Sequence, residues 1–109
     1  MIKVSPAQMR VVREILSRRA PGVEVRAFGS RVDGAPKEHS DLDLAVVAPA
    51  KLGIAALEEL REAFAQSDLP FRIDVLDWNA ISDEFKKVIE GKYEVVQRAE
   101  EDNGGRGGA

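Results

Sequence analysis

The apolar positions of the chain recur with two different periods, and these periods predict its helices and strands. Apolar residues that return every three or four positions, the spacing of a helix with one buried face, occupy 5–20, 52–66 and 82–91. Apolar runs rich in β-branched and aromatic residues, which are typical of strands, occupy 23–29, 42–48 and 71–78. This order of elements predicts an α/β (α+β) fold in which a small mixed sheet is flanked by helices.

Three segments fit neither period. Residues 30–40 contain Gly, Pro and several charges, and they predict a loop with room for one helical turn at its start. Segment 93–97 is short, and its pattern is ambiguous. Residues 99–109 lack large apolar side chains and predict a disordered, Gly-rich tail. The folded domain is therefore expected to span 1–98.

The second predicted strand carries acidic residues on a face that is otherwise apolar. Side chains alternate across a strand, so Leu42, Leu44 and Val46 point to one side. Asp41 and Asp43 point to the other side, together with small apolar residues. Apolar residues on both faces predict a central strand, with the two acids together at its N-terminal edge.

The composition is that of a single globular domain without special surface chemistry. The 109 residues are enough for one modest core, and the net charge of −3 gives no basic surface for general nucleic-acid binding. The absence of cysteine excludes disulfides and thiolate metal sites. No segment approaches the roughly 20 apolar residues of a membrane span, and the N-terminus lacks the pattern of a secretory signal. We therefore expect a cytoplasmic protein.

Three acidic residues form a candidate metal site. Positions two apart on one strand face are separated by roughly 6.5–7 Å, so Asp41 and Asp43 can converge on one divalent cation or on a pair, which offsets their repulsion. Asp74 lies inside the third predicted strand and joins them if the two strands are neighbours. Mg²⁺ prefers such oxygen ligands, and Asp74 is then also placed to take a proton from an attacking hydroxyl. The alternative is a chance D-x-D spacing and a structural Asp74 paired with Arg72.

Gly29 and Ser30, directly after the first predicted strand, form a candidate phosphate-binding turn. Glycine permits close approach of the backbone to a ligand, and the following N–H groups and the Ser30 hydroxyl can hold phosphate oxygens. Arg31 is expected to add a charge-assisted contact to the phosphates. Together with the acids, these residues predict a site for a nucleoside triphosphate with magnesium. Taken alone, a Gly-Ser pair after a strand is more often only a turn.

The combined pattern, Gly29-Ser30, ten further residues and then Asp41-x-Asp43, resembles the signature of the DNA polymerase β-like nucleotidyltransferases. The short chain and the third acid are most similar to the minimal nucleotidyltransferase (MNT) family, over roughly residues 5–90. The resemblance implies a small mixed sheet flanked by helices. It also implies transfer of a nucleoside monophosphate, expected to be AMP from ATP, to a hydroxyl, with release of pyrophosphate and with two Mg²⁺ ions.

Carried over by position, the resemblance assigns roles to individual residues and points to a partner. Asp41, Asp43 and Asp74 become the catalytic, metal-binding carboxylates, and Gly29 and Ser30 become the nucleotide-binding turn. The implied partner is a helical protein of the HEPN (higher eukaryotes and prokaryotes nucleotide-binding) class, with this chain as the antitoxin of a toxin–antitoxin pair. The size of the chain agrees, because it has no second domain to hold an acceptor. A hetero-oligomer or self-association is therefore expected.

One departure from the family pattern leaves other functions open. Many members continue Gly-Ser-Arg with Ala-Arg-Gly, whereas Asp33 stands here close to the expected triphosphate. This acid weakens the electrostatic clamp unless Lys37 or Arg31 compensates. One alternative is a non-catalytic module that neutralises its partner by occlusion. Another is a nucleotidyltransferase that acts on a small molecule or an RNA.

Overall fold

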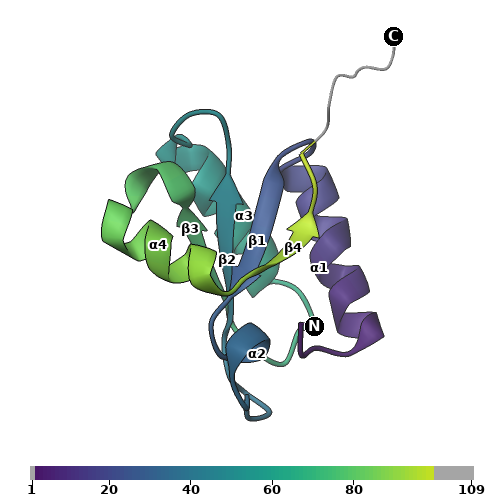
Figure 1. The fold of residues 1–109 in the computed structure, drawn as a ribbon. Coiled ribbons are helices and arrows are strands. Elements are labelled where there is room, and N and C mark those ends of the chain that lie inside the picture. The colour runs from purple at the N-terminus through teal and green to yellow at the C-terminus, as the bar shows by residue number, and fades with distance from the viewer. Residues whose placement is uncertain (1, 100–109) are drawn as a thin grey trace, which may run out of the picture.

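The computed structural model describes residues 2–99, which form one sheet with helices on both faces (Figure 1). The ambiguous segment of the sequence forms the last strand, and the expected helical turn after the first strand is present. In chain order the elements are α1 (Pro6–Arg19), β1 (Glu24–Phe28), α2 (Ser30–Asp33), β2 (Leu42–Val47), α3 (Ile54–Ala65), β3 (Ile73–Asp77), the 3₁₀ turn η1 (Trp78–Ala80), α4 (Asp83–Gly91) and β4 (Glu94–Gln97). Residues 100–109 of the expected tail lie outside the described residues.

The sheet is mixed and has the strand order β3-β2-β1-β4. β1 pairs antiparallel with both β2 and β4, whereas β2 and β3 are parallel and are connected through α3. β2 is therefore an inner strand, as its apolar residues on both faces predicted. In this topology the N-terminal ends of β2 and β3 and the C-terminal end of β1 lie at the same end of the sheet. The candidate site residues all come from that end.

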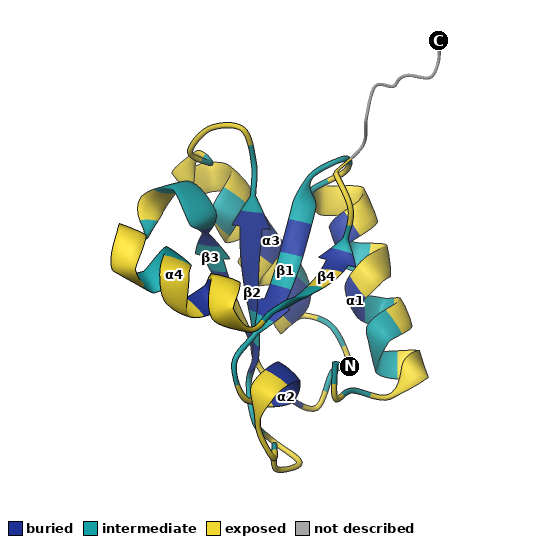
Figure 2. Cartoon of the chain, in the orientation of Figure 1, coloured by how far each residue is buried: buried dark blue, intermediate teal, exposed yellow. Residues whose placement is uncertain are grey.

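The main core lies between the sheet and the helices α1 and α3. Val12 and Leu16 of α1 and Leu60 and Phe64 of α3 are buried against the inward-facing strand residues. Figure 2 shows the buried positions concentrated on the central strands. The inward-facing and adjoining core residues are Val25, Ala27, Val32, Leu42, Leu44, Val46, Phe71, Ile73, Val75 and Val96.

The helix α4 covers part of the opposite face of the sheet. Phe85 packs edge-on against Phe28 of β1, with ring centroids 5.9 Å apart. Ile89 is buried on the same helix. Phe28 pairs in register with Asp43 of β2, so α4 lies on the face that carries the acids. None of the helices in the described part of the chain has the length and apolar content needed to cross a membrane.

Candidate active site

The parallel pairing of β2 and β3 brings two of the predicted carboxylates directly opposite one another. Asp43 of β2 is in register with Asp74 of β3, so their side chains lie on the same face of the sheet. Like charges directly opposite on neighbouring strands are destabilising, and no feature of the fold requires them there. β2 and β3 are therefore neighbours, as is required for Asp74 to lie beside Asp43.

The third acid is engaged in an ion pair. Asp41 precedes β2, and its carboxylate accepts a hydrogen bond from the guanidinium of Arg72 at 3.0 Å. Arg72 therefore pairs with Asp41 rather than with Asp74, the partner considered from the sequence. Both side chains of this pair are partly exposed, so the interaction is worth little by itself. Arg72 places one positive charge beside the three negative charges of the acids. Its position two residues before Asp74, on the same face of the strand, is the feature of the sequence that indicates this role.

A buried and crowded environment raises the pKa of Asp43 from its ordinary value of 3.8 to about 6. The largest cause is loss of solvent around the carboxylate, followed by the negative charges of Asp74 and Asp41. Arg72 acts in the opposite direction. The raised pKa thus reflects first the burial of the Asp43 carboxylate and then the neighbouring negative charges.

Gly29 gives the Asp43 carboxylate its space. The backbone of Gly29 has φ of +84°, a conformation that residues with a side chain rarely adopt. A Cβ atom at this position would lie 2.2 Å from Oδ2 of Asp43. The carboxylate thus packs directly against the turn that leads into α2. Ser30 follows as the first residue of α2, and its side chain is exposed at the same end of the sheet.

The carboxylates fit a divalent cation by their chemistry. Asp43 and Asp74 provide hard oxygen donors on adjacent strands, and a cation would offset both the burial of Asp43 and the repulsion between the two carboxylates. Within residues 2–99, no three Asp, Glu or His side chains already form a group that could hold a metal. Asp41 pairs with Arg72, and its share in a metal site with the other two acids stays a prediction. Release of Asp41 from Arg72 would add a third ligand for a cation held by Asp43 and Asp74.

Arg31 lies away from this cluster, and its position corrects the predicted contact with phosphate. Only 5% of the residue is exposed, and its guanidinium lies 4.1 Å from the ring centre of Phe71. The guanidinium donates to four backbone carbonyl oxygens at 2.8–3.3 Å, those of Lys3, Lys37, Glu38 and Ser40. Arg31 therefore ties the N-terminal segment and the loop before Asp41 to α2. Nothing in the local pattern Gly-Ser-Arg distinguished this inward role from an outward one.

We expect Arg31→Lys to destabilise the protein by about 2–3 kcal/mol. A lysine ammonium cannot reproduce the planar guanidinium that reaches several carbonyl oxygens, so the substitution leaves some of these oxygens without a hydrogen-bond donor. Urea unfolding measures the change in the free energy of unfolding. Arg18→Lys is the matched control, since Arg18 is exposed on α1. Equal unfolding midpoints for the two variants would contradict the role assigned to Arg31.

A small cavity of about 230 Å³ lies between the Gly29 turn and α4. Asp33 and Lys92 both line it, so the acid that departs from the family pattern does face the turn. Lys92, which follows α4, supplies a positive charge beside Asp33. From the sequence, Arg31 or Lys37 was expected to compensate this acid. Sequence reasoning missed Lys92 because only the folded chain brings residues 29 and 92 together. The remaining lining residues are Phe28, Val88 and Ile89.

Comparisons with known proteins agree with this geometry. Residues 9–97 match the nucleotidyltransferase domain family. The "probable protein adenylyltransferase MntA" of Haemophilus influenzae is 41% identical over 99 residues, which cover 91% of this chain and 87% of that protein.

Two solved structures share the fold. A toxin–antitoxin crystal structure with AMP-PNP has a TM-score of 0.71 and 24% identity, over 86% of this chain and 76% of that one. The MNT antitoxin of Shewanella oneidensis, in complex with a tri-AMPylated HEPN toxin, has a TM-score of 0.66 and 22% identity, over 85% of this chain and 71% of that one.

Proposed function

The chain belongs to the nucleotidyltransferase domain family, and from this premise we propose that it transfers AMP from ATP to a hydroxyl group of a HEPN-type partner protein. In this proposal the chain is the antitoxin of a toxin–antitoxin pair and acts in the cytoplasm, where it finds ATP. The observation that carries the proposal is the register of Asp43 with Asp74 beside the Gly29 turn.

The comparisons support each part of the proposal to a different degree. The protein-adenylyltransferase activity is supported by the name of the 41% identical relative. The choice of ATP and of the partner is supported by relatives of the same fold, one solved with AMP-PNP and one in complex with a HEPN toxin.

Each residue of the site has a role in the proposed reaction. The Ser30 hydroxyl and the backbone after Gly29 hold phosphate oxygens of ATP. Asp41, Asp43 and Asp74 would hold Mg²⁺, which supplies positive charge against the phosphates when it is bound. Asp74, which is exposed, also accepts the proton of the acceptor hydroxyl. Positioning and charge stabilisation of this kind account for most of the catalysis of phosphoryl transfer.

The atoms of the transfer balance without a further reactant. The acceptor oxygen forms a bond to the α-phosphorus of ATP, while the bond from that phosphorus to the oxygen bridging to the β-phosphorus breaks. Pyrophosphate leaves with the electron pair of the broken bond. The hydroxyl proton passes to the Asp74 carboxylate and from there to solvent. The products are the adenylylated acceptor, pyrophosphate and one proton.

Labelled ATP tests the proposal directly. The chain is incubated with the protein encoded by the adjacent gene, magnesium and ATP carrying phosphorus label at either the α or the γ position. We expect label on the partner protein from α-labelled ATP and none from γ-labelled ATP. Label from γ-labelled ATP alone would indicate a kinase instead, and label from α-labelled ATP in an added RNA or a small-molecule fraction would show a different acceptor. No label in any fraction would contradict the proposed activity.

The position of Asp33 in the cavity beside Gly29 favours one alternative, neutralisation of the partner by occlusion alone. The two functions make opposite predictions for the double variant Asp41→Asn, Asp43→Asn. If the chain acts by transfer, this variant no longer neutralises its partner in a growth assay. Retained neutralisation would show that binding is sufficient.

A further inference from the structure

The small cavity beside the Gly29 turn is lined by two opposite charges that do not pair with each other. Asp33 ends α2 and Lys92 directly follows α4, and both border this cavity of about 230 Å³. Within residues 2–99, neither side chain has an ion pair or a hydrogen bond. We call this space the Gly29–Lys92 cavity. An ammonium group that faces a cavity without a protein partner is available to an anionic ligand.

The backbone of Lys92 is held on both sides. Its N–H donates a hydrogen bond to the carbonyl oxygen of Ile89 at 3.0 Å, and Ile89 is buried. On the other side, the ring of Tyr93 lies against the guanidinium of Arg26, which is 4.6 Å from the ring centre. The fold therefore fixes where the side chain of Lys92 starts beside Gly29, while its flexible stem lets the ammonium follow a ligand.

The Gly29–Lys92 cavity lies on the same face of the sheet as the carboxylates. Phe28 lines the cavity and pairs in register with Asp43, and the Asp43 carboxylate packs against Gly29. In the strand order, Asp74 of β3 lies beyond Asp43 from this cavity. A nucleotide whose α-phosphate lies at the carboxylates, with phosphate oxygens on the Gly29 turn, therefore places its β- and γ-phosphates next to the cavity.

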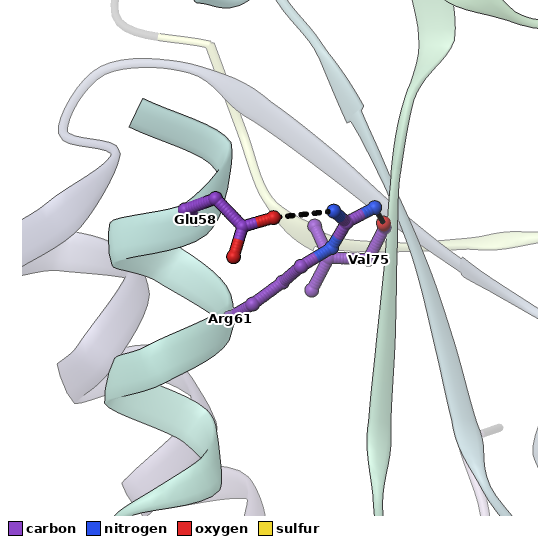
Figure 3. Close-up of polar contacts among 3 residues, drawn as sticks. All are labelled: Glu58, Arg61 and Val75. Carbon is purple, nitrogen blue, oxygen red and sulfur yellow. Dashed lines mark hydrogen bonds and ion pairs between the residues drawn. The ribbon is translucent and has the colours of Figure 1, made fainter. Parts of the chain in front are cut away.

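The arginines near β3 are already engaged. Arg61 of α3 donates to the backbone carbonyl oxygen of Val75 on β3 at 3.0 Å and pairs with Glu58 at 3.2 Å (Figure 3). Arg72 pairs with an acid of the site itself. A phosphate that recruited either arginine would have to break these contacts, whereas Lys92 gives up no contact with the residues of the described range. The charges therefore favour phosphate binding at this lysine.

We propose that the ammonium group of Lys92 binds the β- and γ-phosphates of the nucleotide and stays bound to pyrophosphate until it leaves. The inference rests on the proposed function for the identity of the ligand. Asp33 lies beside the same phosphates and repels them, so the charge of Lys92 also offsets that repulsion. No bond to Lys92 forms or breaks during the transfer. The lysine acts by binding and positioning the leaving group.

Lys92→Met tests the inference, because it removes the charge of the side chain and keeps most of its length. Without the partner protein present, we expect this variant to bind AMP-PNP with magnesium about tenfold more weakly in calorimetry, and pyrophosphate with magnesium more weakly by a similar factor. Binding of AMP, which lacks both phosphates, should be unchanged. Lys92→Arg should retain most of the affinity for AMP-PNP. Lys87→Met is the matched control, because Lys87 is exposed on α4 but is not among the lining residues.

Equal affinity of Lys92→Met and the wild type for AMP-PNP would overturn the inference. A similar loss for AMP and AMP-PNP would overturn it too, because a disturbed fold weakens the binding of both. Unfolding curves check that the variants fold, and Lys92→Gln serves as a second neutral variant if Lys92→Met does not. A wild type that binds AMP-PNP but labels no acceptor contradicts the proposed function alone, and Lys92 is then still judged by these affinities. A wild type that does not bind AMP-PNP overturns the inference by itself.

Discussion

Asp43→Asn is expected to lower AMP transfer by at least about 1,000-fold, equivalent to about 4 kcal/mol of transition-state stabilisation, while making the protein more stable. Asn keeps the shape of the side chain and one oxygen but removes the negative charge that would hold a cation, and the cation would supply positive charge against the phosphates. Burial of Asp43, and then the charges of Asp74 and Asp41, raise the pKa of its carboxylate. A variant with Asn should therefore bind magnesium poorly and retain the fold.

The gain in stability has a defined pH dependence. The pKa of Asp43 is about 6 in the folded protein, against 3.8 ordinarily, so the folded state binds the proton more tightly than the unfolded state. Its favourable contribution is complete below pH 3.8 and is lost as pH rises through about 6. The wild type should thus be less stable than Asp43→Asn at neutral pH, by about 1 kcal/mol after allowance for the partial exposure of the group.

Transfer assays and urea unfolding at several pH values, in the presence of a chelator, measure both effects. Asp68→Asn is a control, since Asp68 is exposed outside the site and should change neither quantity. Retention of activity in Asp43→Asn would exclude the proposed catalytic site. An equal stability difference at pH 4 and pH 8 would contradict the assigned electrostatic cause.

Gly29→Ala is expected to reduce AMP transfer about 100-fold and to destabilise the fold by about 1–2 kcal/mol. Two independent costs add here. The positive φ of Gly29 strains any residue with a Cβ, and that Cβ would lie 2.2 Å from Oδ2 of Asp43. Either the carboxylate moves out of the site or the turn changes its conformation. Both changes misplace the groups that hold the nucleotide.

Gly53→Ala is the control for this substitution. Gly53 has φ of −70°, and a Cβ there would meet nothing within 4 Å. The transfer rate and the urea midpoint of Gly53→Ala should lie close to those of the wild type. If Gly29→Ala also behaves as the wild type does, Asp43 does not depend on the glycine for its position.

The sequence predicted most of the fold because the relevant signals are local. Each pattern can be recognised within its own segment, whether it is the helical period of α1, α3 and α4 or the apolar run of β1, β2 and β3. β4 remained ambiguous because its four residues form a strand only through pairing with β1. The inner position of β2 followed from its apolar residues on both faces, because such a strand must be covered on both sides.

The candidate site was predictable only in part. Gly29, Asp43 and Asp74 occupy the arrangement that their spacing indicated. The inward turn of Arg31 and the ion pair of Asp41 with Arg72 depend on contacts between distant segments, so no local pattern contained them. Lys92 enters the cavity beside Gly29 for the same reason.

The parallel pairing of β2 with β3 also affects when the site can form during synthesis of the chain. Asp43 leaves the ribosome 31 residues before Asp74, the difference between their positions, and the crossover through α3 lies between them. The two negative charges come together only when β3 pairs with β2. A nascent chain therefore cannot pair the two carboxylates until the residues of β3 have been synthesised.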